Sequence, residues 1–335
     1  QMNATAKIAN SLVAAGLADD PARLEFTPLS GGVSSDIWRV DGGYQPICVK
    51  RARSRLAVDA IWEVPVERNH YEAEFLRVVS TEVPGFAPDL LAEDTEQGLI
   101  VLPYLNPAEW QLWKPQLLNG EVDIEVAERV GAHLGRLAKA TRGRADLASR
   151  FDTGALFDDL RLDPYLRECA RKYPDLSQRL TALVETTASC REALVHGDVS
   201  PKNILVNHAS EPVILDAECA WYGDPAFDLA FVLNHLLLKS VVRPDAADTL
   251  RQAISALIDS RAAHDTPSEV APVLARATAL LPALLLARID GKSPAEYLTD
   301  PVRQSVVRVV ARRFLLDPAA HPLEITAALT GDSRP

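Results

Sequence analysis

Three polar side chains follow one another at short intervals in the middle of the chain, each beside an apolar run. Asp198 lies in the segment 196–198, Asn203 follows five positions later, and Asp216 comes eighteen positions after Asp198. A carboxylate in a loop can orient a hydroxyl group for attack on a phosphate, and an amide and a second carboxylate supply oxygen ligands of the kind that Mg²⁺ prefers. The spacing therefore predicts phosphoryl transfer, with Asp198 as the catalytic residue and Asn203 and Asp216 as metal ligands.

The neighbours of Asp198 have predicted roles of their own. We expect His196 to be a packed histidine that bonds the backbone of its loop, with a catalytic base as the alternative. Asp224 stands before Pro225, which is typical of an N-cap residue followed by proline in the first turn. Asp228 comes in that first turn. We expect its carboxylate to brace the loop that carries His196 and Asp198.

Glu218 is a third candidate metal ligand. It lies two residues beyond Asp216, and in an extended segment these two side chains would share a face. The alternative is an edge residue whose carboxylate bonds to backbone.

Lys50 ends an apolar run that is predicted to be a strand over residues 46–50. A lysine on a strand can hold the α- and β-phosphates of a nucleotide when a carboxylate positions it. Glu72, on the helix predicted next, is the expected partner. Glu67 and Glu74 remain alternatives because the same helix carries several acids.

A glycine- and serine-rich segment precedes Lys50 between two predicted strands. Its glycines allow close approach of the backbone to a phosphate, and its serines can donate hydrogen bonds. A hairpin turn is the alternative, and neither a GxGxxG nor a GxxxxGK[ST] pattern is present. The candidate phosphate-binding residues of this segment are Ser30, Gly31, Gly32, Ser34 and Ser35.

The hydrophobic periodicity divides the chain into a mixed first part and a helical second part. In the first part we expect strands over 24–29, 37–40, 46–50, 86–92 and 99–102, and helices over 6–17 and 67–79. Residues 103–107 are predicted to be a hinge, which divides the chain into domains 1–103 and 104–335. The second part is predicted to be helical over 121–141, 164–172, 176–187, 226–239, 245–260, 270–289 and 302–315, with short strands within 193–216.

The composition narrows the class of protein and of partner. The chain has 335 residues and a net charge of −11, so nucleic acid and anionic membranes are unfavourable partners and a cationic or neutral small molecule fits better. The four cysteines lack metal-ligand spacing, which predicts reduced thiols in a reducing compartment. We therefore expect a cytoplasmic protein, monomeric or homodimeric.

The ordered set of Lys50, Glu72, residues 196–198, Asn203 and Asp216, followed by Gly223-Asp224-Pro225, resembles the aminoglycoside phosphotransferase and choline kinase superfamily. The resemblance covers about residues 25–240. It implies an α+β, bilobal protein-kinase-like fold, with a small β-rich N-terminal lobe with one packed helix and a larger, mostly helical C-terminal lobe. It also implies ATP and Mg as cofactors, with the nucleotide at the hinge near Leu102 and Tyr104.

The segment Asp216-Ala217-Glu218 is similar to the DxE segment of methylthioribose kinases. The expected activity is transfer of the γ-phosphate of ATP to a hydroxyl of a small polar, sugar-like acceptor. A methylthioribose-type sugar kinase and a choline or amino-alcohol kinase remain alternatives, and a nucleotide-binding pseudokinase is the alternative of another class. A protein kinase is disfavoured, because few residues separate Asp216 from Pro225.

The helical half is expected to hold the acceptor. Asp158, Asp159 and Asp163 could attract an amine-bearing acceptor, although a solvated helix start is the alternative. Arg288 and Asp290 could bond a sugar hydroxyl or a carboxylate, although they could equally serve the C-terminal end of their helix.

Overall fold

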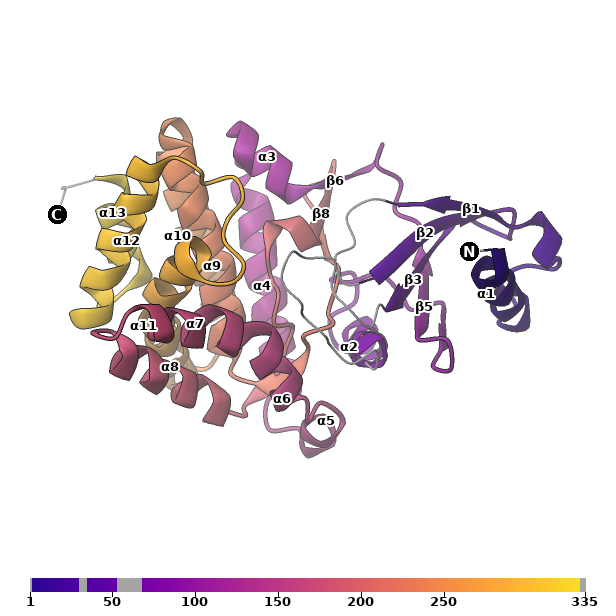
Figure 1. The fold of residues 1–335 in the computed structure, drawn as a ribbon, viewed down its shortest axis with the longest axis horizontal. Coiled ribbons are helices and arrows are strands. Elements are labelled where there is room, and N and C mark those ends of the chain that lie inside the picture. Colours follow the sequence, from indigo (N-terminus) through magenta and orange to yellow (C-terminus); the bar gives the residue numbers. More distant parts are fainter. Residues whose placement is uncertain (1, 30–34, 53–67, 332–335) are drawn as a thin grey trace. The chain divides into compact units, whose positions relative to one another are not determined.

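The computed structural model describes residues 2–29, 35–52 and 68–331 (Figure 1). It divides into two compact units, residues 1–109 and 110–335. In its described residues the first unit is a sheet with two α-helices, and the second consists mainly of helices. The expectation of an α+β chain, with strands gathered in the N-terminal part and helices in the C-terminal part, is confirmed.

Over residues 2–29, 35–52 and 68–109 the first unit forms an antiparallel sheet of five strands, in the order β1-β2-β3-β5-β4. Its elements in chain order are α1 (Met2–Ala14), the short 3-10 helix η1 (Pro21–Arg23), β1 (Glu25–Pro28), β2 (Ser35–Asp41), β3 (Ile47–Ala52), α2 (Arg68–Glu82), β4 (Ala92–Asp94) and β5 (Leu99–Pro103).

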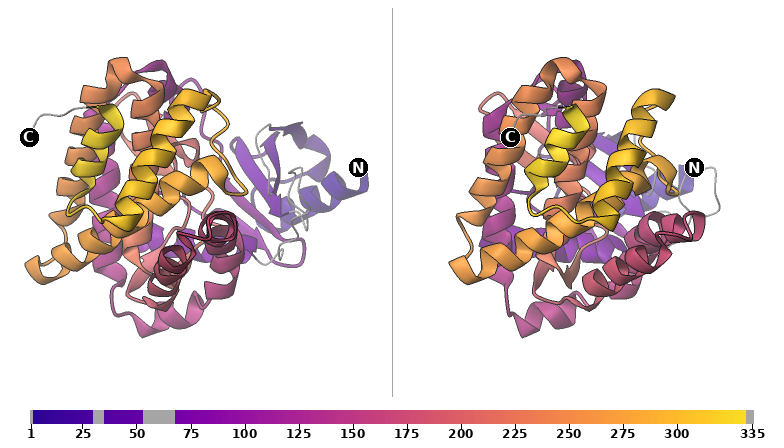
Figure 2. Two further views of the ribbon diagram at one scale, coloured as in Figure 1. Left: turned by 60° about the vertical axis from the view of Figure 1, so that its left-hand side comes forward. Right: turned by 90° about the vertical axis from the view of Figure 1, so that its left-hand side faces the viewer.

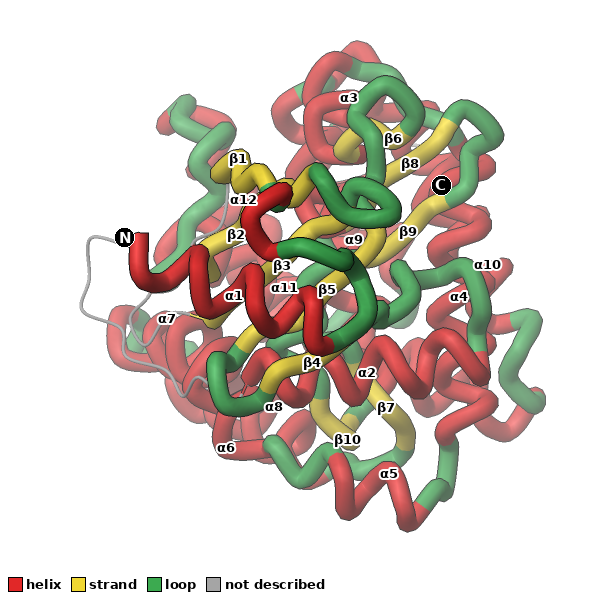
Figure 3. Tube along the Cα trace, turned by 90° about the vertical axis from the view of Figure 1, so that its right-hand side faces the viewer, coloured by secondary structure: helices red, strands yellow, loops and turns green. Residues whose placement is uncertain are grey.

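The two faces of this sheet carry different residues, because side chains alternate along a strand. Ile47 and Val49 of β3 face α1, where they form a buried cluster with Ile8 and Leu12. Figure 3 shows α1 crossing in front of the sheet. Lys50, one position further along β3, faces the opposite way and meets α2.

The strand predicted over 86–92 is wrong, because residues 86–91 are irregular and β4 begins only at Ala92. Phe86 is fully buried, so the apolar character of this run reflects packing against the core and not a strand. Pro88 lies in the middle of the run. Proline has no N–H group to donate to a strand ladder.

The second unit contains a two-stranded sheet, β10-β7, and a three-stranded sheet, β6-β8-β9, among its helices. Its elements are β6 (Trp110–Leu112), α3 (Trp113–Asn119), α4 (Ile124–Thr141), α5 (Ala145–Arg150), α6 (Gly154–Phe157), the π-helix η2 (Asp158–Arg167), α7 (Glu168–Lys172), α8 (Ser177–Ser189), β7 (Ala193–Val195), η3 (Pro201–Asn203), β8 (Ile204–Asn207), β9 (Pro212–Ile214), β10 (Trp221–Gly223), α9 (Pro225–Val242), η4 (Pro244–Ala246), α10 (Ala247–Ala262), α11 (Pro267–Asp290), α12 (Pro301–Leu316) and α13 (Pro322–Thr330).

Helix α9 forms the centre of the second unit. Every one of its residues except Val242 is buried, and α4, α10 and α11 pack against it. Figure 2 shows the orange and yellow helices of this unit packed side by side. Among the described residues, α9 and α11 are long and apolar enough to cross a membrane by length and composition, but 94% and 61% of their most apolar windows are buried within the protein. Core helices pass the same test.

The helix predicted over 164–172 starts earlier and is of another kind. Residues Asp158–Arg167 form a π-helix that contains Pro164, and the α-helical part is only Glu168–Lys172. π-Helical turns are rare and recur at functional sites.

Candidate active site

The hairpin of β8 and β9 brings two of the predicted ligands together. Ile204 pairs with Ile214 in this antiparallel hairpin, and the N–H of Leu215 donates to the carbonyl oxygen of Asn203 at 2.8 Å. Asn203 and Asp216 therefore flank the same end of the hairpin. Asp216 has φ of 68°, a left-handed conformation that is costly for a residue with a Cβ and is concentrated at functional sites.

The loop that carries Asp198 is tied to this end of the hairpin by His196. The N–H of Asp198 donates to Nδ1 of His196 at 3.1 Å, and Nε2 of His196 lies 3.2 Å from the carbonyl oxygen of Leu215. Nδ1 therefore accepts and Nε2 donates, which defines one neutral tautomer. Burial lowers the pKa of His196 to about 4, so the ring remains neutral. The prediction of a packed, loop-bonding histidine is confirmed.

Asp228, in the first turn of α9, holds the same loop. Its carboxylate accepts hydrogen bonds from the N–H of His196 at 2.8 Å and from the N–H of Gly197 at 2.9 Å, which confirms the predicted bracing role. Burial raises the pKa of Asp228 to about 7. Gly197 has φ of 81°, and a Cβ there would lie 2.6 Å from the carbonyl oxygen of Cys219, so the loop requires glycine at this position.

Asn203 and Asp198 are in direct contact. Nδ2 of Asn203 donates to the backbone carbonyl oxygen of Asp198 at 3.1 Å. Since the amide nitrogen is used in this way, Oδ1 is the atom of Asn203 that is suited to bind a cation.

Arg161 is a residue of this site that the sequence analysis missed. Its Nη2 lies 2.9 Å from Oδ2 of Asp198, and its Nε donates to the carbonyl oxygen of Gly197 at 2.7 Å. Nζ of Lys202 lies 3.3 Å from the same oxygen of Asp198. Burial would raise the pKa of Asp198, but the charges of Arg161 and Lys202 lower it below its usual value. The carboxylate is therefore charged at neutral pH.

Glu218 does not lie in the extended segment that was expected. The left-handed conformation of Asp216 is followed by a turn, in which the N–H of Ala220 donates to the carbonyl oxygen of Ala217. The argument from strand alternation therefore fails for Glu218, because Glu218 sits within that turn. Within the described ranges, no three His, Cys, Asp or Glu side chains gather into a metal-binding group.

Asp224 is the N-cap of α9, as predicted. Its side chain accepts from the N–H of Ala226 at 2.9 Å. Arg276 of α11 bonds the same carboxylate through Nε and Nη2 at 2.9 and 3.0 Å. Asp224 thus fixes the start of the helix from which Asp228 supports the loop.

In the first unit, Lys50 and Glu72 form a buried ion pair. Nζ of Lys50 lies 2.6 Å from Oε2 of Glu72, and the two side chains are 7% and 2% exposed. Glu74 instead pairs with Arg77, so of these two acids Glu72 is the partner of Lys50. Asn69 supports the strand by donating to the carbonyl oxygen of Lys50 at 3.3 Å.

The remaining predicted nucleotide-binding residues are also in the first unit. Ser30, Gly31, Gly32 and Ser34 lie outside the described residues. Ser35 begins β2 and is buried.

Leu102 and Tyr104 lie at the end of β5 and just beyond it. Leu102 is buried opposite Cys48 of β3. The Arg39 guanidinium lies over the ring of Tyr104, with its Cζ 4.6 Å from the centre of that ring.

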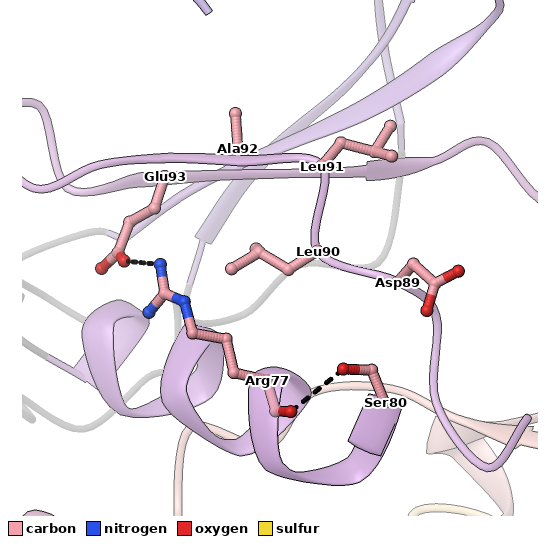
Figure 4. A pocket seen from close by; sticks show the side chains of 7 residues that line it. All are labelled: Arg77, Ser80, Asp89, Leu90, Leu91, Ala92 and Glu93. Atoms are coloured by element: carbon pink, nitrogen blue, oxygen red, sulfur yellow. Dashed lines mark hydrogen bonds and ion pairs between the residues drawn. The ribbon is translucent and has the colours of Figure 1, made fainter. Parts of the chain in front are cut away.

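A surface hollow of about 380 Å³ lies elsewhere in the first unit, between α2 and β4 (Figure 4). Arg77 and Glu93 form an ion pair at its edge, at 2.6 Å. None of the predicted site residues lines it. It is lined by Arg77, Ser80, Asp89, Leu90, Leu91, Ala92 and Glu93.

Residues 25–264 match the family model described as the phosphotransferase enzyme family, APH. The chain belongs to this family. The phosphotransferase is 25% identical over 257 residues to the 4-hydroxytryptamine kinase of Psilocybe cyanescens, covering 67% of this chain and 71% of that protein. It is 23% identical over 235 residues to a methylthioribose kinase of Bacillus cereus, covering 62% of this chain and 59% of that kinase.

Solved structures agree with the predicted fold. The choline kinase from Cryptosporidium parvum Iowa II superposes with a TM-score of 0.56 at 14% identity, covering 95% of this chain and 98% of that one. An amicoumacin kinase in complex with AMP-PNP, Ca²⁺ and Ami gives 0.53 at 13% identity, covering 93% and 94%. At such identities the likeness shows the fold, and the expected protein-kinase-like fold of the phosphotransferase is confirmed.

Proposed function

We propose that this phosphotransferase is an ATP- and Mg-dependent kinase that transfers the γ-phosphate to a hydroxyl group of a small polar acceptor. The observation that carries the proposal is the grouping of Asn203 and Asp216 at one end of the β8–β9 hairpin, next to a charged Asp198. The family match supports the same reaction class.

The donor atoms at the end of the hairpin fit Mg²⁺. Oδ1 of Asn203 and the carboxylate of Asp216 are hard oxygen ligands, and Mg²⁺ is usually bound by one or two protein groups together with phosphates and water. Glu218 is a further candidate. A bound Mg²⁺ would neutralise charge on the transferred phosphate.

The proposed role of Asp198 is to bind and orient the acceptor hydroxyl. Its lowered pKa makes it a weak base, but phosphoryl transfer depends more on positioning than on base strength. The charged carboxylate accepts a hydrogen bond from the acceptor hydroxyl and so directs the hydroxyl oxygen toward the phosphate. Arg161 holds both the carboxylate and the loop backbone, so the direction of Asp198 is fixed before the acceptor binds.

The proposed role of Lys50 is to bind the nucleotide phosphates. Glu72 places a carboxylate 2.6 Å from the Lys50 ammonium nitrogen within a buried environment, which is the arrangement that phosphate-binding lysines of kinases use. Ser30, Gly31, Gly32, Ser34 and Ser35 are proposed to contact the phosphates through the backbone, and Leu102 and Tyr104 to contact the base. A pseudokinase is disfavoured, because all of the polar groups that the reaction needs are present.

The test compares the purified chain with its Asp198→Asn variant. We expect the protein to bind MgATP and to form ADP faster in the presence of a suitable alcohol. Asp198→Asn should abolish phosphate transfer and leave MgATP affinity within a few-fold of the original, because the amide keeps the size of the side chain. Unimpaired transfer by Asp198→Asn, or a failure of the parent protein to bind MgATP, would overturn the proposal.

A further inference from the structure

Cationic side chains gather inside the second unit with few carboxylates around them. Lys239 of α9 is 1% exposed and Arg288 of α11 is 8% exposed, and Lys114 of α3 lies beside them. We call these three residues the cationic cluster. Tyr297 joins the two lysines: Nζ of Lys239 lies 2.9 Å from the Tyr297 hydroxyl, and Nζ of Lys114 lies 5.7 Å from the centre of the Tyr297 ring.

The charges of the cationic cluster are poorly balanced. Glu296 forms an ion pair with Lys114, whereas Lys239 and Arg288 make no ion pair with any of the described residues. Arg288 donates to neutral atoms of Ser293 instead, among them Oγ at 3.1 Å. A buried cation without an anion is costly.

The electrostatic consequence is seen at Lys239. Burial, together with the charges of Lys114 and Arg288, lowers its pKa to about 7, and the opposing effect of Glu296 is smaller. Burial also holds the pKa of His235, one helical turn away, well below its usual value. His235 is therefore neutral and adds no positive charge to the cluster.

Aromatic contacts link the cationic cluster to Arg161 at the site of Asp198. The guanidinium of Arg161, which contacts Asp198, lies 5.6 Å from the ring centre of Phe231. Phe231 stacks edge-on against His235, with ring centres 5.2 Å apart. Phe231, His235 and Lys239 are spaced by four residues along α9 and so share one helical face.

A second connection runs through Tyr165 of the π-helix. The Arg161 guanidinium lies 5.9 Å from the centre of the Tyr165 ring, and Nη1 of Arg288 lies 3.5 Å from the Tyr165 hydroxyl. Next to His235, Asn234 is fully buried, and both polar atoms of its amide lack a hydrogen-bond partner among the described residues. The region thus contains polar groups that a ligand could satisfy.

Resting on the proposed kinase function, we propose that the acceptor carries an anionic group, a carboxylate or a phosphate monoester, which binds Lys239 and Arg288 while its hydroxyl lies at Asp198. Arginine and lysine are the side chains that recognise both anions. The net charge of −11 favoured a cationic or neutral acceptor, but the charge of the cationic cluster has the opposite sign.

Two of the three acidic residues that were expected to attract an amine, Asp158 and Asp163, do not offset this cluster. Asp158 pairs with Arg167. Asp163 pairs with Arg171 and with Lys292, at 3.0 Å each. These carboxylates are therefore engaged by cations of the protein itself, and a cationic acceptor gains little from them.

A binding experiment tests the anion site without requiring turnover. The full chain is labelled at its lysine side chains, and Lys239 is identified by the NMR signal that disappears in Lys239→Met. We expect Lys239 to titrate near pH 7 in the free protein. Saturating inorganic phosphate or glycerate should raise that midpoint by at least about one pH unit, because an anion favours the charged amine. The signal of Lys139, an exposed lysine of α4, should not move.

Glycerate and inorganic phosphate distinguish a site for carboxylates from a site for phosphate monoesters. A shift with glycerate alone assigns the site to carboxylates, and a shift with phosphate alone assigns it to phosphate monoesters. The same shift with ethanolamine, or no shift with either anion, would overturn the proposal. Affinity for the effective anion should fall as the pH rises above about 7, since Lys239 then loses its charge.

A turnover experiment extends the test to the reaction. Hydroxy acids, hydroxyalkyl phosphates, neutral polyols and amino alcohols of matched length are supplied with MgATP. We expect transfer to the anionic members, a loss of at least about tenfold in kcat/KM for them in Lys239→Met, and no loss in Lys139→Met. Equal transfer to neutral or cationic alcohols would overturn the anionic acceptor and leave the kinase proposal intact. Absence of MgATP binding would overturn the kinase proposal, whereas the titration of Lys239 would still decide the anion site.

Discussion

Arg161 contacts Asp198 with one nitrogen of its planar guanidinium and holds the neighbouring backbone with the other two. Nη2 bonds the Asp198 carboxylate at 2.9 Å, Nε bonds the carbonyl oxygen of Gly197 at 2.7 Å, and Nη1 bonds that of Leu160 at 2.7 Å. One side chain therefore connects the π-helix, the loop backbone and the proposed catalytic carboxylate. This arrangement makes Arg161 a positioning residue for Asp198.

Replacement of Arg161 should separate its charge from its shape. We expect Arg161→Met to lower kcat by roughly 100-fold, because small displacements of a reacting group have effects of that size. MgATP affinity should change little. Arg161→Lys should recover only part of the rate, since an ammonium group cannot make the three bonds at once.

The pH profile distinguishes positioning from general destabilisation. Arg161 lowers the pKa of Asp198, so its removal raises that pKa. The acidic limb of the kcat profile, where Asp198 becomes protonated, should move to higher pH in Arg161→Met and less so in Arg161→Lys. An unshifted limb with reduced stability would mean that Arg161 acts only in folding.

Gly197 should be intolerant of a side chain. Gly197→Ala combines a φ of 81° with a Cβ that meets the Cys219 carbonyl oxygen at 2.6 Å. Gly143 is the matched control, because it has φ of 71° and a Cβ there would meet nothing within 4 Å. We expect Gly197→Ala to lose about 2 kcal/mol more unfolding free energy than Gly143→Ala in denaturant titrations. Equal losses would show that the loop can move away from Cys219.

Local chemistry is what the sequence predicted well. Asn203 and Asp216 each adjoin an apolar run that forms one strand of a short hairpin, so their proximity follows from few residues. Lys50 and Glu72 come from a strand and the next helix of the same unit. The residue types alone predicted each pair: two oxygen ligands for Asn203 and Asp216, and opposite charges for Lys50 and Glu72.

Long-range packing is what the sequence could not supply. Arg161 reaches Asp198 from a π-helix whose proline at position 164 gives no ordinary helical signal. Lys114, Lys239 and Arg288 come from three separate helices, and no spacing rule relates them. Arg288 was expected to bond a sugar hydroxyl or a carboxylate or to serve the end of its helix, without any link to Lys114 or Lys239. Only the packing of α3, α9 and α11 reveals that two of them are buried.

The ion pair of the first unit allows a last, charge-selective test. Glu72→Gln keeps the shape of the side chain and removes the negative charge that faces Nζ of Lys50 at 2.6 Å. A buried lysine without that charge has a lowered pKa and a less defined direction. We expect MgATP affinity to fall about tenfold, a loss of the size that a partly compensated charge contact carries.

Glu74→Gln is the matched control, because Glu74 lies on the same helix and pairs with Arg77 on the protein surface. It should leave MgATP affinity unchanged, since surface ion pairs contribute little. Calorimetric titration with MgAMP-PNP measures both variants without turnover. If Glu72→Gln and Glu74→Gln bound the nucleotide equally well, Lys50 would not be the residue that holds its phosphates. In that case the nucleotide-binding role would have to move to other residues of the first unit.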